Sequence, residues 1–344
     1  MPEPINARKK LTFLDHDDHG PALRGFTFDE AVIVTSLIES LVQRNTAQPK
    51  SFTVSEALHL TSAMTATLMG SDPLRYLRPM VEFLQRLVSS GLLVETTQNG
   101  KIGGDRAEDR RFASTAKRAL DEWGRPLAAL ALGLPLVAHQ YADVAVRVHV
   151  DDSDEADIAS GVVIGRNWVL TNEHVVRAAP NVCVSWGTSA RVRAHKIIPS
   201  GNGLDLAVLS VPGLQPLPYT WLRPPETAEP ILVLAYPSIP GVASRPLLSF
   251  NGWVASAEPV VTIFGEQQII VTAVMNPGAS GGPIFGADGC MVGLVVQTLE
   301  GQHVVEHGAN RILQSTFHAA LPADVIMREV RGLHPELALF NEWG

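Results

Sequence analysis

The chain has 344 residues, of which 46% are hydrophobic and 18% are charged. This length and composition exclude a disordered protein and leave room for two domains. The formal net charge of -8 argues against nucleic acid as the main partner of the whole chain. The chain has only two cysteines, Cys183 and Cys290, which also excludes a secreted scaffold cross-linked by several disulfides. We expect both to be buried thiols.

The first 25 residues are polar and predict a flexible tail rather than an apolar signal sequence. The run from Asp15 to His19 contains residue types that bind metals, but a solvated tail is the simpler interpretation. We therefore predict no metal site and no cofactor. No stretch of the sequence is long and apolar enough to cross a membrane. These features predict a cytoplasmic protein without a membrane partner.

Residues 26–123 predict a mainly helical domain that ends in a hairpin. Two capping boxes, Thr27 to Glu30 and Thr53 to Glu56, each open a stretch that favours a helix. Short strands are expected at 92–97 and 110–114, with a glycine-rich turn between them. Helices followed by a two-stranded hairpin resemble a winged-helix domain.

Two functions are open for this N-terminal domain. It could bind DNA, because basic side chains gather near the expected wing: Lys101, Arg106, Arg110, Arg111, Lys117 and Arg118. It could instead be a protein-docking or dimerisation domain of the same shape. The first 125 residues carry as many basic as acidic residues, so the electrostatic attraction that dominates DNA binding is missing. We therefore favour a protein partner or self-association over DNA.

The remainder of the chain has the sequence pattern of an all-β domain. Residues 124–142 are expected to form a linker, residues 143–332 the domain and residues 333–344 a C-terminal tail. Between 143 and 332, short runs rich in valine and isoleucine alternate with glycine, proline and asparagine. Regular short strands with such turns indicate a sandwich or a barrel.

The segment from Asn276 to Pro283 holds a serine, Ser280, among glycines. Glycines allow a tight turn in which consecutive N–H groups point into one hollow. Such a hollow stabilises the negative oxygen of a tetrahedral intermediate, and the amides of Gly278 and Ser280 would form it. A serine hydroxyl also needs a neighbouring base to become a strong nucleophile. The alternative for this segment is a glycine-rich turn with a capping serine.

Two further segments supply the base and its partner. A strand beginning at Trp168 delivers His174 at its end, and Asp205 stands just before a wholly apolar strand. A carboxylate buried there needs a partner, which His174 would provide. Alternatively, His174 is structural and Asp205 belongs to a turn. The chain order of His174, Asp205 and Ser280 is that of the chymotrypsin triad, which favours the catalytic interpretation of all three.

These segments resemble a known family. The pattern G-x-S-G-G-P at 278–283 is similar to the nucleophile motif of trypsin-like peptidases, and the longer run VTAVMNPGASGGPIF resembles HtrA-type enzymes. The residues from Trp168 to Val176 resemble the histidine segment of the same family, and the resemblance covers about residues 143–332. It implies a chymotrypsin-like double β-barrel and a serine endopeptidase in which Ser280 is the nucleophile, His174 the general base and Asp205 the residue that orients the histidine.

The sequence departs from that family in two respects. Ala279 stands where trypsins have an aspartate and HtrA enzymes usually an asparagine. Activation by a freed N-terminus that pairs with this aspartate is therefore not expected, and regulation would come from loop ordering or from the N-terminal domain. We also expect no PDZ domain, since the chain ends at Gly344.

The resemblance also suggests a specificity. The base of the primary pocket would be lined by the two residues Val274 and Met275, and its wall by Val296, Gln297 and Thr298. All five are neutral, so cleavage is expected after small or medium apolar residues.

Three functions remain in competition. The first is a serine endopeptidase regulated by its N-terminal domain. The second is a winged-helix DNA-binding regulator whose peptidase domain is a sensor or a self-cleaving module. The third is a catalytically dead binding module on a protease fold, against which the complete triad argues.

Overall fold

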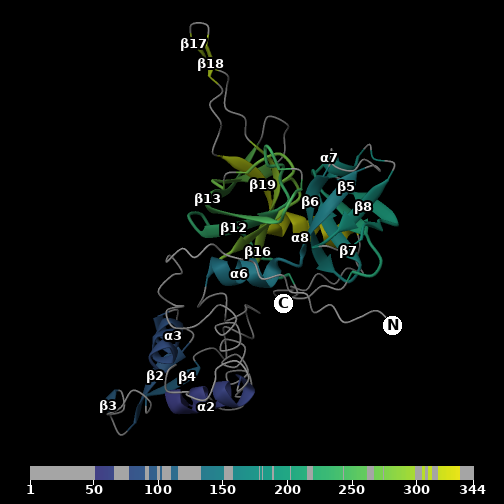
Figure 1. Cartoon of the computed structure of the whole chain (residues 1–344). Helices are drawn as coiled ribbons and strands as arrows, with labels where there is room; N and C mark the ends of the chain where they lie inside the picture. The colour runs from purple at the N-terminus through teal and green to yellow at the C-terminus, as the bar shows by residue number, and fades with distance from the viewer. Residues whose placement is uncertain are drawn as a thin grey trace. The chain divides into compact units, whose positions relative to one another are not determined.

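The computed structural model describes residues 51–65, 77–89, 93–98, 101–102, 110–114 and 133–333; the last range has gaps at 151–157, 178, 180, 188–189, 202, 215–219, 243, 262–266, 274, 299–303, 307–308 and 312–316. The chain divides into two compact units, Met1–Thr115 and Ala116–Gly344 (Figure 1). The first capping box, Thr27 to Glu30, and the run from Asp15 to His19 lie outside the described residues. The domain boundaries expected at 123 and 142 stay predictions.

The first unit contains two helices and a small antiparallel sheet in the order β1-β4-β2-β3. Its described elements are β1 (Phe52–Thr53), α2 (Val54–Thr65), α3 (Leu77–Ser89), β2 (Leu93–Gln98), β3 (Lys101–Ile102) and β4 (Arg111–Ser114). The strands expected at 92–97 and 110–114 are β2 and β4, which pair with each other. The winged-helix interpretation of the whole domain stays a prediction.

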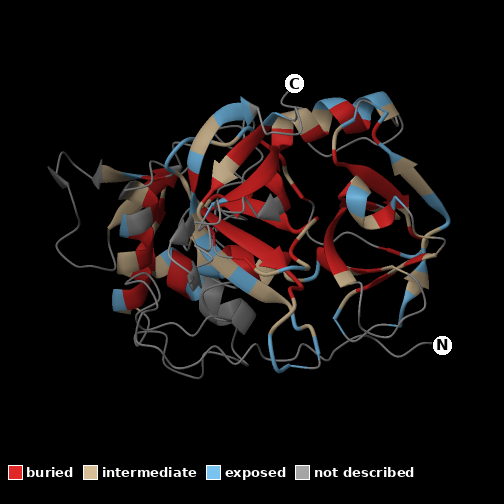
Figure 2. Cartoon of the chain, turned by 90° about the horizontal axis from the view of Figure 1, so that it is seen from above, coloured by how far each residue is buried: buried red, intermediate tan, exposed pale blue. Residues whose placement is uncertain are grey.

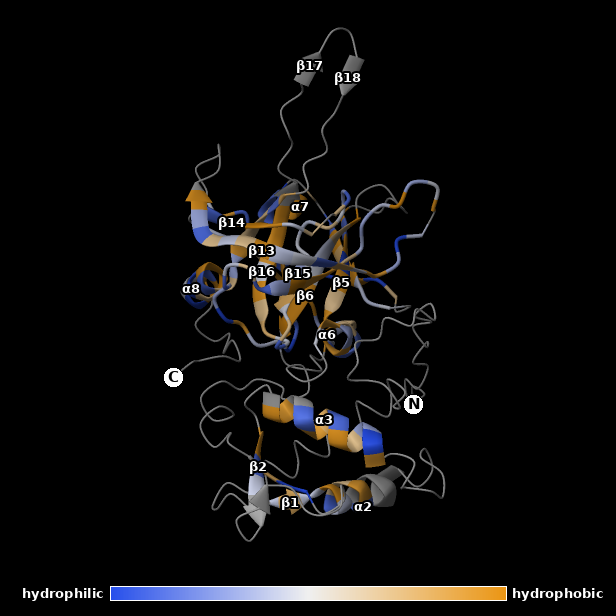
Figure 3. Ribbon diagram, turned by 90° about the vertical axis from the view of Figure 1, so that its left-hand side faces the viewer, coloured by the Kyte–Doolittle hydropathy of each residue, from blue (hydrophilic) through white to orange (hydrophobic). Residues whose placement is uncertain are grey.

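The capping box that opens α2 is confirmed. The Thr53 N–H donates to the Glu56 carboxylate at 2.7 Å, and the Glu56 N–H donates to the Thr53 hydroxyl at 3.0 Å. Helix α3 has apolar and polar stripes in Figure 3. Its apolar residues Met80, Phe83 and Leu84 are buried at the three- and four-residue spacing of one helix face.

The second unit begins with α6 (Leu134–Tyr141), which lies inside the region expected to be a linker. A seven-stranded antiparallel sheet follows in the order β10-β11-β7-β6-β5-β8-β9. Its elements are β5 (Ala145–Val150), β6 (Ile158–Gly165), β7 (Trp168–Thr171), α7 (Glu173–Val176), β8 (Val182–Ser185), β9 (Val192–Arg193), β10 (Lys196–Pro199) and β11 (Ala207–Ser210). Strands β9 and β10 are the two ends of the sheet and are consecutive in the chain, so the sheet curls back on itself.

A closed six-stranded barrel forms the rest of the unit, in the order β12-β13-β14-β19-β16-β15. Its strands are β12 (Pro230–Ala235), β13 (Leu248–Val261), β14 (Gln267–Val271), β15 (Pro283–Gly286), β16 (Met291–Thr298) and β19 (His318–Pro322). The hairpin of β17 (Val304–Glu306) and β18 (Ala309–Arg311) is separate, and α8 (Ala323–Leu333) ends the described chain. The expected all-β barrel fold is confirmed, with closure by strand pairing only in this second half.

Most strands of both halves are largely buried, as the red ribbons of Figure 2 show, whereas β9, β10 and β13 carry mainly intermediate and exposed residues. One apolar cluster continues from the first sheet into one side of the barrel, so the two halves share a core. Tyr141 of α6 is part of this core, with its ring centroid 4.5 Å from that of Phe285. The barrel strands therefore cannot shift against the first sheet without loss of buried apolar contact.

The last helix is fixed to the first sheet. The Ser200 hydroxyl, just after β10, donates to the Glu329 carboxylate of α8 at 2.6 Å, and both residues are buried. Ile326 and Val330 of the same helix belong to the shared core. Among the described residues, no helix is long and apolar enough to span a membrane.

Candidate active site

His174 and Asp205 lie side by side because their strands pair. Antiparallel pairing of β7 with β11 places Thr171 opposite Ala207, so the residues just beyond β7 meet those just before β11. The His174 Nδ1 is 2.6 Å from one Asp205 carboxylate oxygen, and the His174 backbone N–H donates to the other at 2.8 Å. The buried Asn172 side chain donates to the Asp205 carbonyl oxygen at 2.9 Å and holds the turn.

This geometry fixes the orientation of the imidazole. An Nδ1–H donated to Asp205 leaves Nε2 as the basic nitrogen. The Asp205 side chain is 10% exposed, whereas that of His174 is 47% exposed. The pair is thus a carboxylate that is nearly covered and a ring whose other side is open to a reactant.

The segment that carries Ser280 is attached to the first sheet beside the histidine strand. The Ser160 N–H of β6 donates to the Ser280 carbonyl oxygen at 2.9 Å. Gly281 has a φ of +80°, and a Cβ there would lie 2.2 Å from the Ser160 carbonyl oxygen and 2.6 Å from the Thr171 hydroxyl oxygen. The residue after Ser280 therefore packs against the last residue of β7, three positions before His174.

In the described part of the chain, no hydrogen bond joins the Ser280 hydroxyl to His174. Hydrogen bonds of this kind are often long without substrate and tighten when substrate binds. The structure thus brings His174 and Asp205 into contact and holds the backbone of Ser280 next to them.

The peptide groups around Gly278 have a defined direction. The Pro277 carbonyl oxygen accepts from the Ser238 N–H at 2.8 Å, and in a trans peptide the Gly278 N–H points the opposite way. Among the described residues, neither the Gly278 N–H nor the Ser280 N–H has an acceptor. These two amides, the ones expected to bind an oxyanion, remain available to a ligand.

The expected specificity residues are only partly described. Val274 lies outside the described residues, Gln297 and Thr298 are at the end of β16, and Met275 and Val296 are buried. The Met275 N–H donates to Nε2 of His318, a buried residue to which the sequence assigned no role. Burial lowers the pKa of His318, which keeps the ring neutral as an acceptor. The pairing of β14 with β19 places His318 opposite Val271, four residues before Met275, so no local sequence signal reveals this contact.

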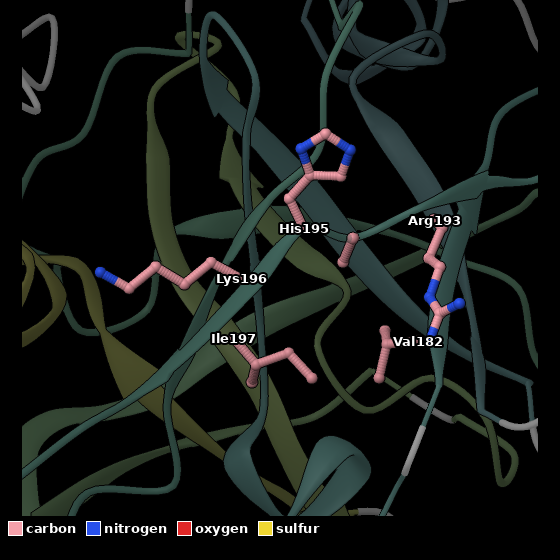
Figure 4. A pocket seen from close by; sticks show the side chains of 6 residues that line it. Val182, Arg193, His195, Lys196 and Ile197 are labelled. Atoms are coloured by element: carbon pink, nitrogen blue, oxygen red, sulfur yellow. The ribbon is translucent and has the colours of Figure 1, made fainter.

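Other candidate sites are weak. A surface hollow of about 460 Å³ lies near β8 and β10, away from the pair described above. Figure 4 shows that its basic side chains, Arg193, His195 and Lys196, point in different directions rather than toward one ligand. Within the described residues, no group of three or more histidine, cysteine, aspartate or glutamate side chains could hold a metal ion.

Comparison with known proteins finds a match within the second unit. Residues 159–294 match the family described as "Trypsin-like peptidase domain". The serine protease Rv3671c of Mycobacterium tuberculosis is 29% identical over 144 residues, which are 40% of this chain and 35% of that protein. The Do-like serine protease HtrA of Bacillus subtilis is 28% identical over 153 residues, 42% of this chain and 34% of the relative. The chain thus spans about a third of the length of these relatives.

Two solved protease structures are similar to part of this chain. An inactive form of the Rv3671c protease has a TM-score of 0.46 and 22% identity, and the match covers 57% of this chain and 92% of that one. The serine endoprotease of Yersinia pestis has a TM-score of 0.46 and 18% identity, covering 59% and 66%. Such scores carry no argument about the fold, which rests on the strand pairing above. By sequence, residues 159–294 match a trypsin-like peptidase domain, and this part of the chain is similar to HtrA-type serine proteases.

Proposed function

We propose that this protein hydrolyses peptide bonds with Ser280 as nucleophile, His174 as general base and Asp205 as the residue that orients the base. One observation carries the proposal: the Nδ1 bond of His174 to a nearly covered carboxylate, next to the loop that holds Ser280. A neutral imidazole held in this tautomer accepts a proton at Nε2.

The chemistry would proceed in two halves. The Ser280 hydroxyl adds to the substrate carbonyl as its proton moves to His174, and the negative oxygen of the intermediate accepts from the Gly278 and Ser280 amides. Collapse of the intermediate breaks the C–N bond, and His174 gives its proton to the leaving amine. Water then attacks the acyl-enzyme by the same route and restores the free serine hydroxyl.

We further propose cleavage after small or medium apolar residues. The support is the burial of Met275 and Val296 together with the neutral character of all the expected pocket residues. A pocket without a charge favours apolar side chains because it cannot compensate the desolvation of a charged one.

For the first unit we propose docking of a protein partner or of a second copy, and thereby regulation of the peptidase. Arg110, a candidate DNA contact, is engaged by Glu95 in two hydrogen bonds of 2.6 and 2.7 Å. The hydrogen bond to Glu95 raises the pKa of Arg110, and that from Arg110 lowers the pKa of Glu95. A guanidinium already neutralised by a carboxylate contributes little to phosphate binding.

The alternative is a DNA-binding regulator with a sensing or self-cleaving peptidase domain. Titration of the full chain with random-sequence duplex DNA at two salt concentrations distinguishes the two functions. We expect no complex at physiological salt. A complex that weakens steeply as salt increases would favour the alternative. A cytoplasmic location stays a prediction.

Labelling with a fluorophosphonate probe tests the peptidase proposal, because this reagent phosphonylates only an activated serine. We expect the wild type to be labelled and Ser280→Ala to be unlabelled. Ser256→Ala is the control, since the Ser256 hydroxyl donates to the nearby Glu258 carbonyl oxygen and not to the loop that carries Ser280; it should label like the wild type. Equal labelling of Ser280→Ala and the wild type would contradict the assignment of the nucleophile.

A further inference from the structure

Ser160 is a fully buried serine of β6, 0% exposed. Its N–H, carbonyl oxygen and hydroxyl all form hydrogen bonds at or beside the loop that carries Ser280 (residues 276–282, called the nucleophile loop below). Its N–H donates to the Ser280 carbonyl oxygen at 2.9 Å, and its own carbonyl oxygen accepts from the Thr171 hydroxyl at 2.8 Å. Its hydroxyl donates to the Gly278 carbonyl oxygen at 2.8 Å and accepts from the Tyr236 N–H at 2.9 Å. One residue thus connects both expected oxyanion donors with the strand that leads to His174.

The direction of the Ser160 hydroxyl is determined by its two partners. A hydroxyl has a single hydrogen. The Tyr236 N–H can only donate, so it occupies a lone pair of the Ser160 oxygen, and the hydroxyl hydrogen points to the Gly278 carbonyl oxygen. Tyr236 is itself buried, and its phenol donates to the Ala145 carbonyl oxygen at 3.3 Å. The donor to Gly278 is therefore held in place from both sides.

Gly278 needs such a restraint. Its φ of +98° lies in a region that glycine enters freely, so its own torsion angles do little to hold it there. The peptide before Gly278 is restrained by the bond from Ser238 to the Pro277 carbonyl. The peptide after it is restrained by the Ser160 hydroxyl and by the Ala279 N–H, which donates to Asn276 at 3.2 Å.

We propose that Ser160 is a positioning residue that keeps the Gly278 amide aimed at the developing oxyanion. This inference rests on the proposed peptidase function. The backbone of Ser160 already satisfies the needs of the sheet and of the Ser280 carbonyl. The hydroxyl adds bonds to Gly278 and Tyr236 only, so its removal acts on the donor geometry and not on the pair of His174 and Asp205.

Saturation kinetics of fluorophosphonate labelling test this role in the full chain. Ser160→Ala should lower the limiting rate of labelling by about 10- to 100-fold, somewhat less than the loss expected for removal of a donor itself. The half-saturating probe concentration should change by less than about twofold, and the apparent pKa of the limiting rate should stay the same, because both depend on groups that the substitution leaves in place. Ser160→Cys, with a weaker donor, should fall between Ser160→Ala and the wild type.

Thr220→Val is the matched control. The Thr220 hydroxyl is also buried and also donates to a backbone carbonyl, but this carbonyl, that of Val163 at 3.1 Å, belongs to β6 and not to the loop that carries Ser280. It should lose stability much as Ser160→Ala does and keep its labelling rate. A limiting rate for Ser160→Ala within twofold of the wild type, or an equal loss in Thr220→Val, would overturn the assignment.

A crystal structure of Ser160→Ala separates this inference from the proposed function. We expect the peptide that joins Gly278 to Ala279 to be rotated or to adopt two conformations, and the Gly278 N–H of the preceding peptide, which shares the Gly278 Cα, to change direction with it. An unchanged peptide would overturn the role of Ser160 even if the wild type labels normally. A wild type that does not label would instead contradict the peptidase function, and the same crystal structure would still decide the positioning role.

Discussion

Gly281 shows how tightly the nucleophile loop fits against the first sheet. Two separate demands exclude a side chain there: the positive φ and the lack of space beside Ser160 and Thr171. Gly241 has the same φ of +80° but no atom within 4 Å of the position that a Cβ would occupy. Substituting each of the two glycines therefore separates the free-energy cost of the backbone conformation from that of steric crowding.

We expect Gly281→Ala to lower the free energy of unfolding by more than about 3 kcal/mol, and Gly241→Ala by about 1 kcal/mol. The difference arises because the new methyl group of Gly281→Ala must push apart two backbone segments. Denaturant unfolding of both variants measures it. Equal losses would show that the loop can move away from β6 without cost.

The buried surroundings of His149 shift its pKa and thereby make the stability of the fold depend on pH. Its ring is 5% exposed, Nε2 is 2.8 Å from the Ser185 hydroxyl, and Nδ1 has no hydrogen-bond partner. Burial, together with the positive charges of Arg191 and Arg147, lowers the pKa of His149 to about 4. The ring is therefore neutral in the folded protein over most of the acid range.

This shift makes folding dependent on pH. Between about pH 6.5 and pH 4 the unfolded chain binds a proton at His149 and the folded chain does not, so stability decreases as the pH falls through that window, by up to about 3 kcal/mol. His149→Gln can keep a hydrogen bond to Ser185 but cannot titrate. Its unfolding free energy should depend less on pH in this window than that of the wild type, and parallel curves would refute the prediction.

Among the elements, α2 has the clearest local signal in the sequence. The reciprocal bonds of Thr53 and Glu56 satisfy two donors that a helix start leaves without partners. A capping box is recognisable because its partners are three residues apart. The same reasoning cannot identify contacts between strands that lie far apart in the chain.

Thr53→Ala should lower the stability of the first unit by about 1 kcal/mol, since it removes the acceptor for the Glu56 N–H. Arg78→Ala is the comparison in the neighbouring helix: its ion pair with Glu82 leaves the Arg78 side chain 89% exposed, and about 0.5 kcal/mol or less is expected. Thermal unfolding of the full chain, followed by hydrogen exchange of α2, measures both. An equal effect of the two substitutions would contradict the importance of the cap.

In the whole molecule, the crossing from the first sheet to the barrel is held by a buried charge cluster. Arg223 bonds to Asp288 at 2.7 Å and to Glu229 at 2.5 Å, and each of the three side chains is 10% exposed or less. Burial alone would lower the pKa of Arg223, but the hydrogen bonds to Glu229 and Asp288 raise it. The Arg223 N–H also donates to the Met291 carbonyl at the start of β16, so the crossing is fixed by backbone as well.

Arg223→Ala should destabilise the protein by about 3–5 kcal/mol, because it leaves two buried carboxylates without a cation. Lowering the pH should restore part of the lost stability, because protonation neutralises the two unpaired carboxylates. Chemical denaturation at pH 7 and pH 5 measures the effect relative to the wild type. A loss no larger than that of the exposed Arg78→Ala would show that the cluster is solvated in solution.

The sequence predicted the all-β barrel fold and indicated the segments of His174, Asp205 and Ser280, because each has a local pattern; the catalytic roles of these three residues stay predictions. Asp205 could be paired with His174 in advance, since a carboxylate before an apolar strand needs a partner. Ser160 and Arg223 could not be interpreted, because their partners are up to 120 residues away and meet them only when the strands close. The sequence did not predict that only the second half closes by strand pairing, because the pairing of edge strands leaves no local sequence pattern. Val274 is outside the described residues, so its role stays a prediction.

The bond between Ser200 and Glu329 has a consequence for biosynthesis. A ribosome releases the first sheet well before α8, yet α8 supplies part of the core on which that sheet packs. A nascent chain that has emerged only as far as Ser280 therefore contains every triad residue but lacks β16, β19 and the final helix. Under the proposed peptidase function, we therefore do not expect the growing polypeptide to cut itself or its neighbours before α8 has emerged.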